Sequence, residues 1–465
     1  MQRLWSPLVV LLLSYCFSGS QANRVYIHPF SLFAFTNATC EDLQTPVSKP
    51  QETFPVVPLD IEVLTPDSRN LSKLNTQRQN TTSERMVVLA ELSNALGLRM
   101  FKAFSSSQKG TNTLLSPVNT FGSLVTLYLG ASKTTASFFQ LKSIFFRRGT
   151  DLEDCVSLVD GHKILKTLQS INSLVDDKAN VEVATLIWAF TRRDTRLSKD
   201  FIQGTQDFSD SSFIRSVDFS KPQEAEQLVN SFVEKTSEGE VKSIFKDVNS
   251  SSNFLFLSSF YFEGNWKATF DPEKTSLQEF HVDETTTVMV PLMTHTGHYN
   301  YTKDEVRRCT VVKLPLSKQF KMLLVLPHDG PSLHELESKL NTESITDWNQ
   351  NLQEGLLELS LPKFSMSSVT DLRDLLTSMS PEIEDKLLGS EAEFSQLSNH
   401  KRFTIDKALN KVVFEMSEER AGHQDRMQQA GIPLKLSINR PFFFSVTEGN
   451  SNAIFMLGKI TNPAL

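Results

Sequence analysis

Short apolar runs constrain the fold of this chain more than any other feature of its sequence. Phe254–Leu257 is apolar at every position, which favours a strand buried on both of its faces. Leu356–Pro362 alternates apolar and polar side chains instead, as a strand with one exposed face does. Three further runs also indicate strands: Lys321–Pro327, Pro441–Val446 and Ile454–Gly458. The chain is therefore expected to contain several strands, and the segments between them decide the class of fold.

A helical pattern precedes these strands and is expected to start after Ser83, whose hydroxyl suits an N-cap. Its apolar residues recur every three or four positions: Met86, Leu89, Leu92, Leu96 and Met100. Helices and strands then mix without the strand–helix–strand rhythm of a parallel sheet, so the sequence predicts an α+β fold in one large domain. Of the 465 residues 39% are hydrophobic, and the 34 Phe indicate a dry, aromatic-rich interior.

The N-terminus predicts secretion. The apolar run Leu8–Leu13 follows Arg3 and precedes the small residues Ser20 and Ala22, which is the pattern of a signal peptide cleaved after Ala22. The run is too short to span a bilayer, and no later stretch reaches about 18 apolar residues. We therefore expect a soluble extracellular protein without membrane insertion. Its net charge of −7 provides no electrostatic footprint for nucleic acid.

Residues 23–83 are expected to form an extended tail. Prolines interrupt regular structure at positions 46, 50, 55, 58 and 66, and Gln, Asn, Ser and Thr dominate from Ser68 to Ser83. Asn-x-Ser/Thr sequons for surface glycans begin at Asn37, Asn70, Asn80, Asn249 and Asn300.

Secretion also determines what the cysteines indicate. Cys16 leaves with the signal peptide, so Cys40, Cys155 and Cys309 remain. An odd number of cysteines in an oxidising compartment indicates one disulfide and one leftover thiol. From the sequence alone, any two of the three can form the bond.

Several blocks of the chain resemble the serpin family in the family's own order. The most characteristic are Phe262–Trp266, Phe270–Pro272 and Val290–Met293. Others are Leu115–Asn119, Leu361–Phe364, Asn439–Phe442, Leu457–Gly458 and Asn462–Pro463. The resemblance covers residues 84–465. It implies three β-sheets surrounded by about nine helices, with an exposed reactive-centre-like loop.

Inhibitory serpins trap proteases by inserting that loop into a sheet, and their loop begins with an acidic pair, Gly, Thr and a run of Ala. Here Glu418 and Glu419 match the acidic pair, but Arg420 stands at the Gly position. His423–Arg426 then interrupts the run of small residues. Burying unpaired charges in an inserted strand costs several kcal/mol. We therefore expect a non-inhibitory serpin. A protease inhibitor is the alternative.

The segment after the signal peptide carries a second resemblance. Asn23–Phe30 is similar to the vasoactive octapeptides of the angiotensin family, with Asn in the first place and Ile in the fifth. Ser31 and Leu32 complete a decapeptide. The resemblance implies a hormone precursor with four parts: a signal peptide (1–22), the decapeptide (23–32), an extended glycosylated tail (33–83) and the serpin domain (84–465).

Leu32–Phe33 joins two large apolar residues, as aspartic proteases prefer when they bind a substrate as an extended strand. The resemblance implies renin as the protease that cuts this bond. A dipeptidyl carboxypeptidase, the converting enzyme, would then cut after Phe30 and remove Ser31–Leu32. The next such cut would fall at His28–Pro29, which has no N–H and is expected to resist.

The octapeptide has chemical groups that a receptor pocket can bind. Arg24 is a cation, Phe30 supplies the terminal carboxylate, and the β-branched residues favour extended backbone. Its full receptor-binding set is Asn23, Arg24, Val25, Tyr26, Ile27, His28, Pro29 and Phe30. The resemblance implies a seven-helix G-protein-coupled receptor as partner. It also implies a vasoconstrictor role in blood pressure and in salt and fluid balance.

The resemblance further implies a disulfide between Cys40 in the tail and Cys155 in the body, which leaves Cys309 as an unpaired thiol in a strand. In the chain-entropy model, closing a loop of about 115 residues stabilises the fold by roughly 4–5 kcal/mol. Since Cys40 lies close to Leu32–Phe33, we hypothesise that breaking this bond changes the rate of cleavage. A purely structural role for the disulfide is the alternative.

No pattern in the sequence indicates an enzyme. His295 and His298 are spaced like a metal pair, but no ligand cluster accompanies them, and we expect surface histidines. No G-x-S-x-G motif, P-loop or dinucleotide fingerprint occurs. Lys142–Arg148 is mildly basic and fits the end of an amphipathic helix better than a heparin site. No catalytic residues, metal or cofactor are therefore expected.

Overall fold

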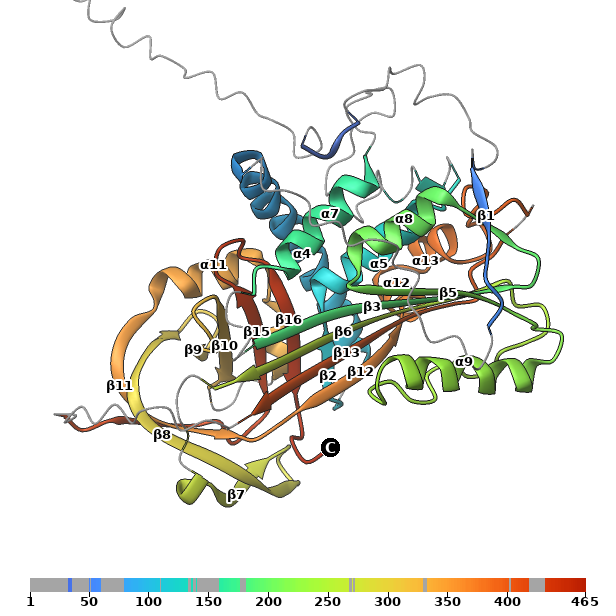
Figure 1. Ribbon diagram of the computed structural model, residues 1–465. Helices are drawn as coiled ribbons and strands as arrows, with labels where there is room; N and C mark the ends of the chain where they lie inside the picture. The colour runs from blue at the N-terminus through green and yellow to red at the C-terminus, as the bar shows by residue number, and fades with distance from the viewer. Residues whose placement is uncertain are drawn as a thin grey trace, which may run out of the picture.

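The computed structural model describes residues 32–35, 50, 52–59, 79–108, 110–132, 135–136, 139, 159–175, 181–266, 270, 272–328, 333–400, 403–417 and 431–465. These residues form nine α-helices and three β-sheets packed as one body (Figure 1). The α+β class predicted from the sequence is confirmed.

A five-stranded sheet runs through the middle of the molecule in the order β12-β13-β6-β3-β5 (Figure 1). Its central strand β6 pairs in parallel with β13 and antiparallel with β3. The predicted strand Phe254–Leu257 is confirmed as the start of β6 and is fully buried. The strands are β3 (Val181–Arg192), β5 (Ser211–Val217), β6 (Phe254–Asn265), β12 (Met366–Asp371) and β13 (Lys407–Ser417).

Both faces of this sheet are covered, which explains why β6 begins with four apolar residues. Leu255 and Leu257 belong to a small apolar cluster formed with α9 (Pro222–Thr236). Phe254 and Phe256 belong to the main core on the opposite face, which includes residues of α5 (Pro117–Tyr128). Alternate side chains of one strand thus fill two separate cores.

A nine-stranded sheet has the order β14-β11-β8-β9-β10-β15-β16-β2. Its ninth strand, β7, pairs with the N-terminal part of β8. The long strand β8 curves around one end of the molecule (Figure 1). The four other predicted strands are confirmed within β10, β11, β15 and β16, although Pro441 lies just before β15. The strands are β2 (Thr113–Leu115), β7 (Ser276–His281), β8 (Thr287–Asp304), β9 (Cys309–Pro315), β10 (Phe320–Pro327), β11 (Gln353–Pro362), β14 (Leu434–Ser437), β15 (Phe442–Glu448) and β16 (Ile454–Ile460).

The predicted N-terminal helix is present as α4 (Gln79–Ser107), but it begins at Gln79 and not after Ser83. It therefore takes in the last residues of the segment that was expected to be extended. The remaining helices are α7 (Gly161–Asn172), α8 (Lys199–Phe208), α10 (Leu333–Ser338), α11 (Thr342–Asn351), α12 (Leu372–Met379) and α13 (Pro381–Leu387), with a 3-10 turn at Pro272–Lys274.

Aromatic side chains dominate the core, as the Phe content predicts. Phe414 and Phe444 lie with ring centroids 5.1 Å apart, and Phe364 contacts both rings. Trp266 and Phe270 are almost fully buried, 5.7 Å apart and edge to face. Both rings belong to the main hydrophobic core.

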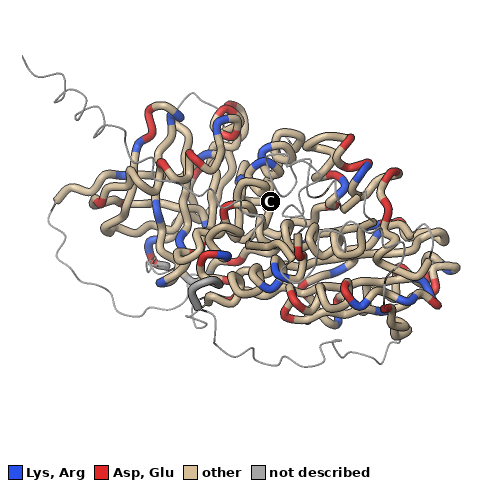
Figure 2. Tube along the Cα trace, turned by 90° about the horizontal axis from the view of Figure 1, so that it is seen from above, with Lys and Arg blue, Asp and Glu red and all other residues tan. Residues whose placement is uncertain are grey.

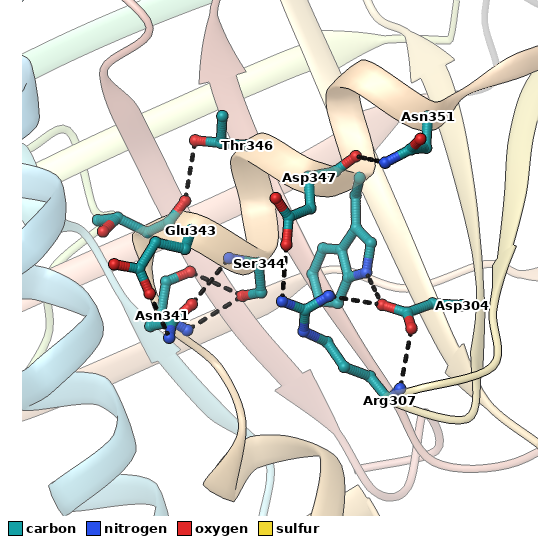
Figure 3. A network of polar contacts seen from close by, with 10 residues as sticks. Asp304, Arg307, Asn341, Glu343, Ser344, Thr346, Asp347 and Asn351 are labelled. Atoms are coloured by element: carbon teal, nitrogen blue, oxygen red, sulfur yellow. Dashed lines mark hydrogen bonds and ion pairs between the residues drawn. The ribbon is translucent and has the colours of Figure 1, made fainter.

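A polar network fastens the β8–β9 turn to α11 (Figure 3). Asp304 accepts hydrogen bonds from the Arg307 amide (2.8 Å), the Arg307 guanidinium (2.9 Å) and the Trp348 indole (2.8 Å). Arg307 also pairs with Asp347 at 2.8 Å. Burial alone would raise the pKa of Asp304, but these hydrogen bonds and the Arg307 charge hold it below its ordinary value.

Candidate protease-cleavage site in the tail

The predicted cleavage site lies in the first described segment of the chain and is docked against the body. Leu32 and Phe33 have helical backbone conformation. The Phe33 side chain is 0% exposed and belongs to the main hydrophobic core, and Leu32 packs against that core half-buried. Phe35, two residues further on, is 43% exposed. Of the four described residues in this segment, Phe33 is therefore the most deeply buried.

Backbone contacts hold this segment against the start of α7. The Asp160 amide donates a hydrogen bond of 2.8 Å to the Phe33 carbonyl oxygen. Ala34 forms an antiparallel bridge with Val159, and the Lys163 ammonium donates to the Ala34 carbonyl oxygen. The peptide groups on the C-terminal side of the Leu32–Phe33 bond are therefore engaged by the body.

Local sequence around α7 explains why this docking surface is ordered. Asp160 is the N-cap of α7, and its carboxylate accepts hydrogen bonds from the His162 and Lys163 amides (3.1 and 3.3 Å). The Asp160 carboxylate also lies 3.8 Å from the Lys163 ammonium. The Tyr128 hydroxyl donates to the Val159 carbonyl oxygen at 3.0 Å. Each group that contacts the tail is thus itself held in place.

The expectation that the tail presents Leu32–Phe33 as an extended strand is wrong for this structure. The apolar character of Phe33, which suits a protease pocket, suits the protein's own core equally well, and the core contains it. A protease that binds its substrate in extended form must therefore draw Phe33 out of the body first.

A second described segment of the tail is docked beside the start of α8. In this segment, the tail strap (Glu52–Leu59), β1 (Thr53–Pro55) pairs antiparallel with β4 (Arg196–Ser198) and forms the third sheet. Further along, the Leu59 amide donates to the Ser216 carbonyl oxygen at 2.8 Å. The sequence offered no signal for this strap, because its prolines favour irregular structure.

Several predicted site residues lie outside the described part of the chain. They are Ala22, Asn23–Ser31, Asn37, Cys40, Asn70, Lys142–Arg148, Cys155 and the loop residues Glu418–Arg426. The other sequons are placed. Asn80 lies in α4, Asn300 is exposed on β8, and Asn249 is exposed with its side-chain oxygen accepting from the Ser251 amide at 2.9 Å.

Cys309 is a free thiol in the strand β9, as the resemblance implies, and its side chain is fully buried. Burial raises the pKa of this thiol to about 12, so it is protonated and unreactive at neutral pH.

The expectation of two surface histidines is only half right. His298 is exposed and lies 3.6 Å from Glu354. His295 is half-buried, packs against the Phe270 ring and has its Nδ1 2.6 Å from the Tyr299 hydroxyl oxygen. Burial, assisted by the Lys274 charge, lowers the pKa of His295. Among the described residues, no group of three or more His, Cys, Asp or Glu side chains is arranged to hold a metal ion.

The surface charges are mixed. Lys and Arg are interspersed with Asp and Glu along the described chain (Figure 2), and ion pairs such as Lys386–Glu382 in α13 join residues one helical turn apart. No helix in the described ranges is long and apolar enough to cross a bilayer.

Comparison with known proteins decides the family. Residues 91–463 match the family model of serpins, the serine protease inhibitors. This chain belongs to the serpin family. Among solved structures, human thyroxine-binding globulin is similar with a TM-score of 0.70 and 26% identity over 81% of this chain and 99% of that one. Mouse protein-Z-dependent protease inhibitor has a TM-score of 0.72 at 23% identity and covers 83% of this chain and 100% of that one.

Curated relatives narrow the group within the family. Angiotensinogen of Bos taurus is 29% identical over 95% of this serpin and 94% of its own length, and that of Rattus norvegicus is 29% identical over 96% and 95%. Human angiotensinogen is 28% identical over 95% and 94%. Serpin A3-7 of Bos taurus matches only 81% of this chain. The protein is thus an angiotensinogen-like serpin, and the serpin fold implied by the sequence motifs is confirmed.

Proposed function

We propose that this serpin is a secreted precursor of angiotensin peptides. A renin-type aspartic protease cuts between Leu32 and Phe33 and releases the decapeptide Asn23–Leu32. A dipeptidyl carboxypeptidase then removes Ser31–Leu32, and the octapeptide Asn23–Phe30 acts on a G-protein-coupled receptor as a vasoconstrictor. The observation that carries the proposal is the similarity to angiotensinogens over 95% of the chain, which extends beyond the serpin domain into the tail.

In this proposal the serpin body does not inhibit proteases and catalyses no reaction. Arg420 and His423–Arg426 in the loop support this, since their charges and bulk oppose burial in a sheet. A protease inhibitor that carries the peptide remains the second candidate, because the family as a whole is named for inhibition.

The secretory route follows from the signal peptide, which is removed after Ala22. It is consistent with glycans at Asn37, Asn70, Asn80, Asn249 and Asn300 and with a Cys40–Cys155 disulfide. Equal renin kinetics for the parent protein and Cys40→Ser would refute a role of that disulfide in cleavage.

Docking of Phe33 gives the body a function in this scheme. The bond between Leu32 and Phe33 becomes available only after Phe33 leaves the core and Lys163 releases the Ala34 carbonyl oxygen. The body therefore lowers the rate of peptide release relative to a free tail peptide.

Incubation of the secreted protein with renin, followed by sequencing of both products, tests the proposal. We expect a peptide of residues 23–32 and a body that begins at Phe33. Leu32→Asp, which places a charge at the scissile bond, serves as the uncleaved control. An SDS-stable covalent complex with any member of a serine protease panel would support the inhibitor and refute the precursor with an inert body.

A further inference from the structure

The tail strap (Glu52–Leu59) is held by side chains as well as by its strand pairing. The Lys199 ammonium pairs with the Glu52 carboxylate at 2.9 Å. The Arg196 guanidinium donates to the Thr53 hydroxyl at 3.2 Å and to the Thr53 carbonyl oxygen at 2.6 Å. Arg196 is the first residue of β4, and Lys199 is the first residue of α8, which follows directly.

The second half of the strap covers the outer edge of the five-stranded sheet. Ser216 of the edge strand β5 donates its amide to the Val57 carbonyl oxygen at 2.9 Å and accepts from the Leu59 amide at 2.8 Å. Leu59 packs on the apolar cluster beneath α9, and Val56 packs on the main core. The strap therefore packs as part of the body. Because it follows the proposed cleavage site in the sequence, it would stay with the body after cleavage.

We propose that the tail strap is a second anchor that keeps Phe33 docked and so restrains peptide release. The effect on peptide release rests on the proposed function. The effect of the strap on the docking of Phe33 does not depend on that function. When Phe33 leaves the core, it stays tethered at Glu52 and returns by closing a loop. The entropy cost of that closure depends on the length of chain between the two anchors.

The positions of the anchors set the size of the effect. Residues 34–51, 18 in all, separate Phe33 from the strap. Without the strap, the next described anchor is the start of α4 at Gln79. Residues 34–78, 45 in all, would then separate Phe33 from that anchor. For closure probabilities that scale as the −3/2 power of loop length, the docked state is favoured about fourfold more with the strap than without it.

The proposed Cys40–Cys155 disulfide provides an internal control. It would anchor the tail closer to Phe33 than the strap does, so the strap would then add little. The fourfold effect is expected in the Cys40→Ser background and should be largely lost in the oxidised parent.

The test replaces Glu52–Leu59 by a Gly-Ser sequence of equal length in the Cys40→Ser protein. Hydrogen exchange of the Asp160 amide, which donates to the Phe33 carbonyl oxygen, measures undocking without any protease. We expect exchange about fourfold faster, with unchanged exchange in the buried strand β6 as the control for an intact fold. An unchanged rate at Asp160 would overturn the proposal.

A charge-swap pair tests the strap without removing it. In the Cys40→Ser protein, Lys199→Glu should also accelerate exchange at Asp160, because it replaces an attraction to Glu52 by a repulsion. Adding Glu52→Lys should restore the rate of the Cys40→Ser protein, and failure to restore it contradicts the proposed anchor. Lys435→Glu on β14, whose ion pair with Glu358 (3.3 Å) lies on the nine-stranded sheet, is the matched control and should leave the rate unchanged. Faster exchange at Asp160 together with no renin cleavage at Leu32–Phe33 would refute the precursor function and leave the strap proposal standing.

Discussion

Replacing Phe33 by Ala tests how strongly the body restrains cleavage. The Phe33 side chain is 0% exposed, and truncating a fully buried Phe to Ala costs about 3–5 kcal/mol. The undocked tail does not bury this side chain, so the loss falls on the docked state alone. Since about 1.4 kcal/mol is tenfold in an equilibrium constant, the undocking constant should rise roughly 10²- to 10⁴-fold.

The assay must separate undocking from the protease's own preference for Phe after the cut. We would measure kcat/KM of renin for the full protein and for a free peptide of residues 23–36, each with and without Phe33→Ala. The ratio of protein to peptide reports undocking, because the intrinsic effect of the substitution cancels. This ratio should rise steeply towards one, the value for a tail that is always undocked.

A variant that leaves the scissile sequence unchanged gives an independent measurement. Lys163→Met keeps the apolar stem but removes the ammonium that donates to the Ala34 carbonyl oxygen. A hydrogen bond to a charged group contributes about 1.5–3 kcal/mol, so cleavage should accelerate at least tenfold. Lys166→Met, on the same helix and paired with Asp207, is the matched control and should have no effect. An unchanged protein-to-peptide ratio in both Phe33→Ala and Lys163→Met would refute the reasoning.

Three further predictions concern stability. Glu337→Gln should lower the free energy of unfolding by about 3–5 kcal/mol in urea titrations, because the buried Lys459 ammonium would lose the carboxylate 3.4 Å away. The double variant Glu337→Leu, Lys459→Met buries no unpaired charge, so its free energy of unfolding should fall by less. Because the pKa of Asp304 is lowered in the folded state, its contribution is present above about pH 4 and is lost as pH falls below; the stability of Asp304→Asn should therefore decline less than that of the parent between pH 5 and 3. Gly122→Ala should lower Tm by several degrees in calorimetry, since the new Cβ would lie 2.1 Å from the Phe208 ring.

Most of the fold could be predicted from the sequence because its signals are local. The period of the apolar residues distinguishes strands from helices without any long-range information, and Phe254–Leu257 is an example whose two buried faces were correctly expected. The start of α4 was misplaced because the polar residues before Ser83 carry no apolar period, although the helix includes them. His295 was expected to be exposed because no local pattern indicates its burial. The contacts with Phe270 and Tyr299 form only in the folded chain.

The sequence by itself determined the class of fold, the serpin motifs and the likeness of Asn23–Phe30 to a peptide hormone, because each depends on residues close together in the chain. Only the tertiary structure decided where Phe33 and the tail strap lie. An apolar residue such as Phe33 gains free energy in any dry pocket, whether in a protease or in its own core, and the sequence does not distinguish the two. The choice depends on Asp160 and Lys163, more than 120 positions further along the chain, which bind the backbone beside Phe33.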